Sequence, residues 1–250
     1  MTAARFDARR LDRLAARMEA HVASGRYAGV SWRIGTLEGT VQEGHAGAAD
    51  ARSLWRIYSM TKPIVSVAAM QLVEACRTPL HAGIRRWLPE FAAPVVLLPS
   101  GARAPAETPI TVMQLLSHMA GLSYGFLGDG AARGYAAAGV LADEALPLRE
   151  QAKLIASLPL ANQPGARWRY SVASDVLAAL LEVEEDHPIR EILRARIFEP
   201  LGMEETAFFV PEAERGRIVE MRGTRLPPTA PRVPPLGVDS AYPADLPEYG

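Results

Sequence analysis

The sequence predicts an α/β fold of the α+β kind, with an antiparallel sheet flanked by helices and a mainly helical lobe. Val30, Trp32 and Ile34 alternate with polar residues, which is the pattern of a half-buried strand. A glycine-bounded turn at 35–39 then leads to a second extended run around Val41, which completes a β-hairpin. Much of the chain after this hairpin has apolar residues at helical spacing, so helices are expected to dominate the fold.

The first helix is expected near the N-terminus, where Leu11, Leu14 and Met18 recur at helical spacing among arginines. This stretch lacks the unbroken apolar region of a secretory signal, so a cytoplasmic location is expected. An Ala-rich stretch at 131–145 is expected to be a loop. Further helices are expected over 63–75, near 111–118, near 148–158, from about Ser174, and over 188–198.

The predicted sheet has too few strands to be complete. Only two strands are evident, and an isolated two-stranded hairpin is marginal in water. The last 25 residues contain seven prolines and no periodic apolar pattern, so they do not supply regular strands. The sequence therefore predicts one domain over 1–225, with an incomplete sheet, and a Pro-rich loop or tail over 226–250.

Composition argues against several classes of function. The chain has 250 residues, 49% of them hydrophobic and 22% charged, and a formal net charge of −1. This charge argues against general nucleic-acid binding, and no apolar run approaches the ~20 residues needed to span a bilayer. The histidines show no paired ligand spacing and Cys76 is the single cysteine, so neither a metal site nor a cofactor is expected. Formation of a homo-oligomer is left open.

Residues 59–62, Ser-Met-Thr-Lys, place a nucleophile and a proton acceptor one helical turn apart. The chain has 27 basic residues, of which only Lys62 and Lys153 are lysines. Arginine cannot lose its proton in a protein, whereas a desolvated lysine can, so lysine at position 62 indicates proton transfer. The apolar run after Lys62 predicts a helix buried on nearly all sides, with Ser59 and Lys62 in its first, electropositive turn.

Four segments resemble, in the same order, landmarks of the serine β-lactamase and penicillin-binding-protein superfamily, above all its class C β-lactamase-like esterases of the family VIII type. The resemblance extends from about residue 10 to about residue 210. It implies a β-lactamase/transpeptidase-like fold that works without a cofactor. The segments are Ser-Met-Thr-Lys at 59–62, Leu-Leu-Ser-His-Met-Ala-Gly-Leu at 115–122, Pro-Gly-Ala-Arg-Trp-Arg-Tyr-Ser at 164–171 and Ile-Phe-Glu-Pro-Leu-Gly-Met at 197–203.

The resemblance implies a catalytic role for three residues. Ser59 would attack a carbonyl carbon and form an acyl-enzyme, because a serine hydroxyl becomes a good nucleophile when a base lies within hydrogen-bond reach. Lys62 would be that base, and Tyr170 would shuttle a proton during acylation or deacylation. His118, in the second landmark, is expected to be structural.

Three further positions are expected to contact the substrate. Tyr124 and Phe126 follow the second landmark and are candidates for the wall of the acyl pocket. Val172 stands where many β-lactamases and peptidases have an asparagine that contacts the substrate amide. An apolar side chain cannot make that hydrogen bond, so Val172 favours an ester substrate over a β-lactam or a peptide.

The third motif of the superfamily is not found in the sequence. Neither a Lys-Thr-Gly, a His-x-Gly nor a Trp-x-Gly segment occurs after Tyr170. In the family this motif lies on a strand that gives one backbone donor of the oxyanion hole. Loss of one such donor in other hydrolases raises the activation free energy by about 2.7–4 kcal/mol. The chain thus resembles the N-terminal two-thirds of such an enzyme, and it is expected to be a truncated product, a form completed by another chain, or a relative without catalysis.

A competing pattern suggests a different nucleophile. Residues 121–125, Gly-Leu-Ser-Tyr-Gly, fit the nucleophile elbow of α/β-hydrolases, and Asp175 and His187 follow in the matching order. An elbow needs a strand before it and a helix after it, whereas a helix is expected before Ser123 and a Gly-rich loop after it. The elbow is therefore the weaker interpretation.

The sequence as a whole predicts a serine hydrolase of the β-lactamase-like esterase type. It would hydrolyse small carboxylic esters through an acyl intermediate on Ser59, with Lys62 and Tyr170 transferring protons. A β-lactamase or D,D-peptidase is the first alternative, which Val172 disfavours. A truncated, catalytically inactive relative is the second alternative, and the missing third motif is the reason to consider it.

Overall fold

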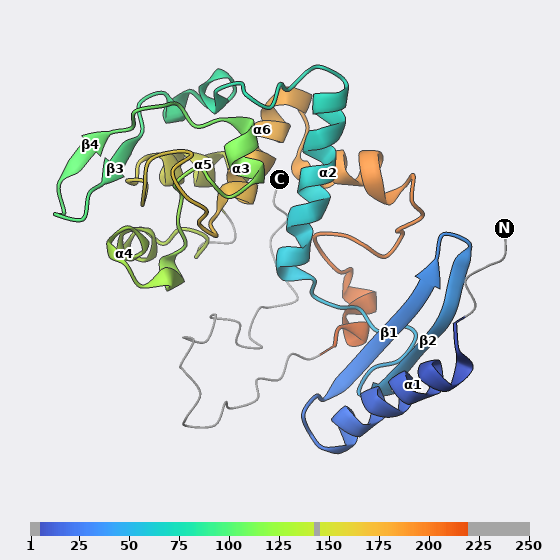
Figure 1. The fold of residues 1–250 in the computed structure, drawn as a ribbon. Coiled ribbons are helices and arrows are strands. Elements are labelled where there is room, and N and C mark those ends of the chain that lie inside the picture. Colours follow the sequence, from blue (N-terminus) through green and yellow to red (C-terminus); the bar gives the residue numbers. More distant parts are fainter. Residues whose placement is uncertain (1–5, 143–145, 220–250) are drawn as a thin grey trace. The chain divides into compact units, whose positions relative to one another are not determined.

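The computed structural model describes residues 6–142 and 146–219, which form two compact units (Figure 1). One unit consists of residues 6–56 and 210–219, and the other of residues 57–209 without 143–145. The tail expected over 226–250 lies outside the described residues. The expected single domain over 1–225 stays a prediction.

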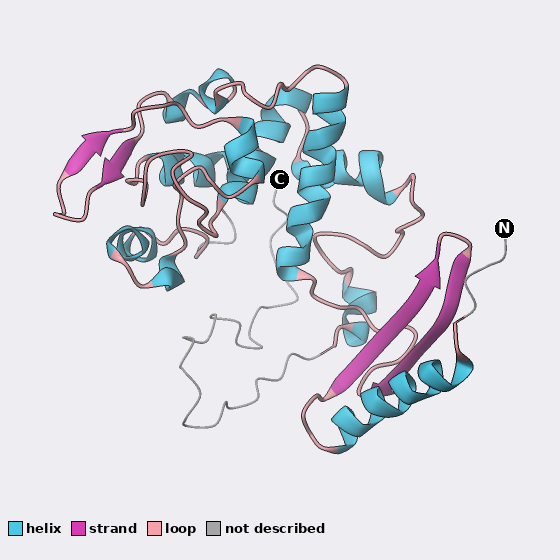
Figure 2. Cartoon of the chain, in the orientation of Figure 1, coloured by secondary structure: helices cyan, strands magenta, loops and turns pink. Residues whose placement is uncertain are grey.

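The smaller unit consists mainly of one helix on a β-hairpin (Figure 2). Helix α1 (Ala8–Ala23) begins at Asp7, whose carboxylate accepts a hydrogen bond from the backbone of Arg9 at 2.9 Å. Strands β1 (Gly29–Thr36) and β2 (Gly39–Gly47) pair antiparallel. Both strands extend into the expected 35–39 turn. The predicted hairpin is therefore confirmed, with a tighter turn than expected.

The packing of this hairpin is thin in the described residues. Trp32 pairs with Gly44, and a Cβ atom at Gly44 would lie 2.3 Å from the indole ring, so the ring occupies the space that a side chain there would need. Beyond the hairpin, the described part adds a parallel bridge between Leu54 and Ile218. Ala49, which is 8% exposed, is the one buried apolar residue among the described residues 6–56 and 210–219. The expectation of a partial sheet is thus confirmed for the part of the chain that the structure describes.

The larger unit is mainly helical. A 3₁₀ turn (Tyr58–Met60) leads into α2 (Thr61–Glu74), and two short strands, β3 (Val95–Leu97) and β4 (Arg103–Pro105), form a second antiparallel hairpin. The later helices are α3 (Val112–Leu116), α4 (Gly130–Ala137), α5 (Leu148–Ala156), α6 (Ala173–Glu185) and α7 (Ile189–Leu193), which continues as a π-helical turn (Arg194–Phe198). Shorter 3₁₀ turns are Ile84–Arg86, Pro89–Phe91, Gly125–Leu127 and, in the smaller unit, Glu212–Arg217.

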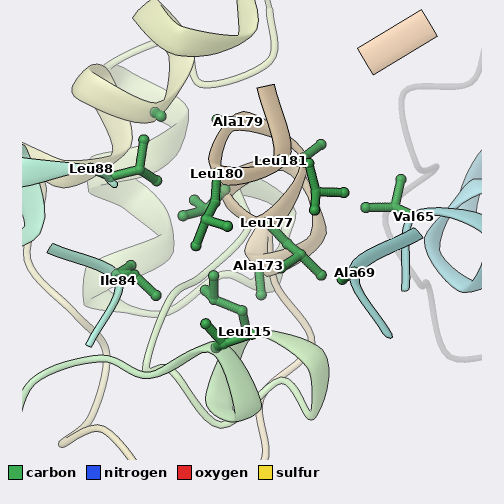
Figure 3. Packing of buried hydrophobic residues seen from close by; sticks show 14 of the residues in the cluster. Val65, Ala69, Ile84, Leu88, Leu115, Ala173, Leu177, Ala179, Leu180 and Leu181 are labelled. Atoms are coloured by element: carbon green, nitrogen blue, oxygen red, sulfur yellow. The ribbon is translucent and has the colours of Figure 1, made fainter. Parts of the chain in front are cut away.

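Helix α6 is the centre of the larger unit and contacts α2, α3, α5 and α7. Leu177 and Leu180 are among its buried residues and pack with Leu115 of α3 (Figure 3). Burial of one such leucine stabilises the fold by roughly 1.5–3 kcal/mol. Because α6 begins at Ala173, the same packing fixes the position of the segment just before it, which contains Tyr170.

Charged side chains join the C-terminal ends of α2 and α6. Arg77 forms ion pairs with Glu184 at 3.0 Å and with Glu185 at 2.5 Å, and Arg196 pairs with Glu185 at 2.5 Å. The indole nitrogen of Trp87 donates to Glu184 at 2.7 Å. These contacts hold the far end of α2 in place and leave its N-terminal end, where Lys62 lies, outside the network.

Two expectations about the larger unit are wrong. The Ala-rich stretch expected as a loop contains α4, because Asp129 caps the helix by accepting a hydrogen bond from the backbone of Ala132 at 2.9 Å. Helix α2 is not buried on nearly all sides, since Val67 and Met70 are 49% and 44% exposed in the structure as described. The other helices lie where the sequence places them, to within a few residues.

Gly121 holds the loop after α3 against residues 160–162. It has a φ of +81°, and a Cβ atom there would lie 2.3 Å from the carbonyl oxygen of Asn162. The backbone N–H of Ala161 donates to the carbonyl oxygen of Gly121 at 2.7 Å. A side chain at this position would therefore meet both an unfavourable backbone angle and a steric clash.

We expect Gly121→Ala to lower the free energy of unfolding by about 2 kcal/mol or more, because both penalties act together. Gly134→Ala is the matched control, since Gly134 lies in the middle of α4 with open space around it. Alanine there is expected to be neutral or to stabilise by up to ~1 kcal/mol. Urea denaturation followed by circular dichroism measures both changes, and equal midpoints for the two variants would contradict this account of Gly121.

Candidate active site

Ser59 and Lys62 meet at the start of α2. Ser59 lies in the 3₁₀ turn before the helix and is exposed, and Lys62 is the second residue of α2 and half-buried. The Lys62 amino group donates a hydrogen bond to the Ser59 Oγ atom at 3.3 Å. Tyr58, just before the serine, has a φ of +41°, a left-handed value that is uncommon for a bulky residue and typical of functional sites.

Tyr170 reaches the same oxygen from a distant part of the sequence. It lies in the non-helical segment before α6, and its hydroxyl donates to the Ser59 Oγ atom at 2.7 Å, although the two residues are 111 positions apart. The structure therefore brings together the three residues for which the resemblance implies catalysis. A nucleophilic oxygen with two proton-transfer groups in hydrogen-bond reach is suited to covalent catalysis.

Aromatic rings line one side of this arrangement. The ring of Tyr124 lies 5.4 Å from that of Tyr170 and is stacked on Phe126 at 4.8 Å. The Lys62 Nζ atom lies 5.1 Å from the ring centre of Tyr170 and 5.6 Å from that of Tyr124, which is within cation–π range. Burial raises the pKa of Tyr124, with a smaller contribution from Asp175, so this phenol stays protonated. Tyr124 thus lies next to Lys62 and Tyr170, and Phe126 lies on Tyr124, while a substrate contact of either ring stays a prediction.

Val172 is not among the residues around Ser59. It is completely buried at the N-terminal end of α6, and its side chain belongs to the apolar core. A side chain without exposed surface cannot touch a substrate in this structure. The prediction of a substrate contact at Val172 is therefore wrong. The other part of the argument still holds, because this position has no side-chain amide that could bond a substrate.

His118 supports Tyr170 from behind. Its ring lies 5.0 Å from the ring of Tyr170 and 6.2 Å from that of Trp168, and its Nδ1 atom lies 3.3 Å from the Ser171 hydroxyl. Burial, followed by the charge of Lys62, lowers the pKa of His118, which favours a neutral imidazole. His118 thus packs against Tyr170 in surroundings that disfavour its charged form.

The nucleophile elbow suggested by Gly-Leu-Ser-Tyr-Gly does not form. Ser123 is completely buried, and its Oγ atom accepts a hydrogen bond from Arg169 at 2.8 Å. His187 is exposed and lies 3.8 Å from Glu191, with which it could pair when protonated. The segment before Ser123 follows α3 rather than a strand. A buried serine held by an arginine cannot act as an accessible nucleophile.

The sequence indicates Asp175 only as part of the elbow pattern, yet in the structure it lies close to Lys62. Asp175 as a whole is partly exposed, but its carboxyl group is buried and interacts electrostatically with the charge of Lys62. Burial raises the pKa of Asp175 to about 6, and the nearby Lys62 opposes this rise. Its place in the first turn of α6, five positions after Tyr170, could have indicated its proximity to the site.

The described residues hold neither a metal-binding cluster nor a helix that could cross a membrane. Within 6–142 and 146–219, no group of three or more His, Cys, Asp or Glu side chains is arranged to hold a metal ion. In the same ranges, no helix combines the length and apolar character that a bilayer crossing requires.

The fold and the arrangement around Ser59 place the protein in the β-lactamase/transpeptidase-like class. A model of the Beta-lactamase family matches residues 14–246, and the chain belongs to this family. Esterase EstB of Burkholderia gladioli is 37% identical over 168 residues, which are 65% of this chain and 40% of EstB. Lovastatin esterase of Penicillium rubens is 31% identical over 196 residues, or 74% of this chain and 48% of that enzyme. The chain spans less than half the length of these curated relatives.

Solved structures agree with this assignment. EstCE1, described as a hydrolase with promiscuous acyltransferase activity, matches with a TM-score of 0.69 and 28% identity over 83% of this chain and 55% of EstCE1. Simvastatin synthase from Aspergillus terreus matches with a TM-score of 0.68 over 84% of this chain and 56% of that chain, and at 24% identity this likeness concerns the fold. The family and the fold class expected from the sequence are confirmed.

The raised pKa of Asp175 predicts a pH-dependent stability difference. The folded chain binds this proton more tightly than the unfolded chain, so the stabilisation is complete below about pH 4 and is lost as the pH rises through about 6. The Asp175→Asn side chain cannot ionise, so the variant does not lose stability in this way as the pH rises. Relative to the wild type, the variant is therefore expected to gain on the order of 2 kcal/mol between about pH 4 and pH 7.5. Urea denaturation at both values measures this gain, and a gap that does not change with pH would contradict it.

Proposed function

We propose that this chain is a serine hydrolase of the β-lactamase-like esterase type that acts on small carboxylic esters. The observation that supports this most directly is the position of the exposed Ser59 Oγ atom, 3.3 Å from the Lys62 amino group and 2.7 Å from the Tyr170 hydroxyl. A serine becomes nucleophilic when its proton can leave to a neighbouring base. Both neighbours are groups that can move protons.

In the proposed mechanism, Ser59 attacks the carbonyl carbon of the ester while its proton passes to the pair of Lys62 and Tyr170. The positive end of α2 stabilises the negative charge that develops on the oxygens. The same pair returns the proton to the departing alcohol, which leaves an acyl group on Ser59. Water then attacks this acyl-enzyme, and the pair takes up and returns a proton in the same way, which frees the acid and Ser59.

Relatives support the ester as substrate. EstB and lovastatin esterase are named as esterases, and EstCE1 is described as a hydrolase with acyltransferase activity. Each of these names describes transfer of an acyl group. The half-buried ring of Tyr124 lies next to Lys62 and Tyr170, and the exposed ring of Phe126 is stacked on it, which suits an uncharged acyl chain better than a charged one. The cytoplasmic location and the oligomeric state stay open predictions.

Two alternatives to the esterase function each have one observation in their favour. The family name itself keeps a β-lactamase or D,D-peptidase in consideration, but Val172 is apolar and buried and offers no hydrogen bond to an amide. An inactive relative is the other alternative, because the sequence after Tyr170 has no third motif. Stable acylation of Ser59 by benzylpenicillin without ester turnover would favour the first alternative. Absence of both reactions would favour the second.

The proposal predicts which substitutions abolish hydrolysis of p-nitrophenyl acetate by the whole chain. Ser59→Ala is expected to lower kcat at least about 10³-fold, and Lys62→Arg and Tyr170→Phe each about 10²- to 10⁴-fold, because proton transfer fails. Lys62→Arg keeps the charge and removes the ability to release a proton.

The matched controls are Lys153→Arg and Ser157→Ala, which change the same residue types on α5 and at its C-terminal end. Lys153 is exposed and paired with Glu150, and Ser157 bonds the backbone of Leu154. Both controls should keep the wild-type rate to within about twofold. Wild-type rates in Ser59→Ala would refute the proposed nucleophile.

A further inference from the structure

A mostly buried arginine lies next to the proposed catalytic tyrosine. Arg169 stands between Trp168, which is 64% exposed, and Tyr170, whose hydroxyl reaches Ser59. The side chain of Arg169 is only 16% exposed. A guanidinium group in such a position is costly unless it is paired.

The partners of Arg169 lie at the two ends of one loop. Its terminal nitrogen donates to the Ser123 Oγ atom at 2.8 Å and forms a short ion pair with the carboxylate of Asp129. Ser123 and Asp129 flank residues 124–128, the loop that contains the stacked rings of Tyr124 and Phe126. One guanidinium group thus ties both ends of the loop to the segment that contains Tyr170.

The surroundings of Asp129 favour the ionised carboxylate that pairs with Arg169. Burial alone would raise its pKa, but the backbone N–H of Ala132 and the guanidinium of Arg169 outweigh burial and lower the pKa of Asp129. The same carboxylate caps α4. The beginning of α4 and the end of the loop are therefore fixed at the same point.

Backbone hydrogen bonds fix the other side of the contact. The N–H of Arg169 donates to the carbonyl oxygen of His118 at 2.8 Å, and the N–H of Val172 donates to that of Ser123 at 3.3 Å. These bonds align the chain on either side of Tyr170 with the chain before Tyr124. The 3₁₀ turn of the loop, Gly125–Leu127, packs on α4, and Arg169 adds side-chain ties at both ends of the loop.

We propose that Arg169 is a positioning residue that holds the Tyr124–Phe126 wall beside Ser59 and thereby sets the preference for the acyl chain of the substrate. An ordered apolar wall favours a longer acyl chain, because each added methylene gains contact only where the wall stays in place. The effect on the acyl chain rests on the proposed function. The effect on the order of the loop does not.

The test compares Arg169→Gln with the wild type and with Arg167→Gln. The control removes the same charge from an exposed position two residues away. Amide hydrogen exchange in peptides that cover 124–128 is expected to accelerate at least about fivefold in Arg169→Gln and to stay unchanged in Arg167→Gln. Arg169→Lys can keep one of the two ties and is expected to restore part of the protection.

Ester kinetics supply a second readout that a merely structural role would not move. In Arg169→Gln, the KM for p-nitrophenyl hexanoate is expected to rise at least about fivefold, with a change below about twofold for the acetate. Equal changes in KM for both esters would overturn the role in acyl preference. If the wild type turns over neither ester, the proposed function fails, and the exchange data still decide whether Arg169 orders the loop.

Loss of the whole fold is also distinguishable. If exchange in α6 accelerates together with that in 124–128, Arg169→Gln has unfolded, and Ser123→Ala then decides, because it removes one tie and little volume. Faster exchange confined to 124–128 in Ser123→Ala supports the proposal. Wild-type exchange of 124–128 in a folded variant of Arg169 or Ser123 overturns it.

Discussion

The structure around Ser59 depends on two hydrogen bonds that converge on its Oγ atom, one from Lys62 and one from Tyr170. The first is local, because the two residues are separated by one helical turn. The second joins positions 111 residues apart and exists only if the segment before α6 is held against the start of α2. The buried apolar residues of α6 provide that hold through their contacts with α2 and α3, and the ion pairs of Arg77 fix the opposite ends of the helices.

The residues around Ser59, Lys62 and Tyr170 contribute in different ways, some by packing and some by charge. The ring of His118 packs against Tyr170, and Arg169 bonds both ends of the loop that contains Tyr124 and Phe126. Asp175 brings a buried carboxyl group close to Lys62, at a cost in stability above about pH 6. Such a cost is expected at a functional site, where local stability is exchanged for a defined electrostatic environment.

The sequence predicts the parts of this arrangement that depend on local spacing. The turn between Ser59 and Lys62, the capped helix after Thr111 and the hairpin of alternating residues all follow from near neighbours. Tyr170 came from the resemblance, since no local pattern links it to Ser59. The contacts of Arg169 span 40 and 46 positions, so no periodicity could reveal them. Helix α4 was missed because its alanines and glycines form no apolar stripe, although Asp129 is a good cap. Val172 was misplaced because alignment of a motif does not determine burial.

The most direct test of the central claim is to map the site of covalent modification after the whole chain reacts with a fluorophosphonate. This reagent modifies serines that are both accessible and activated by a neighbouring base. Proteolysis and mass spectrometry of the labelled chain should place a single adduct on Ser59, with none on Ser123. Labelling that is lost on replacing Lys62 with Arg would tie the reactivity to proton transfer. An adduct on Ser123, or a native chain in which no serine is modified, would contradict the account.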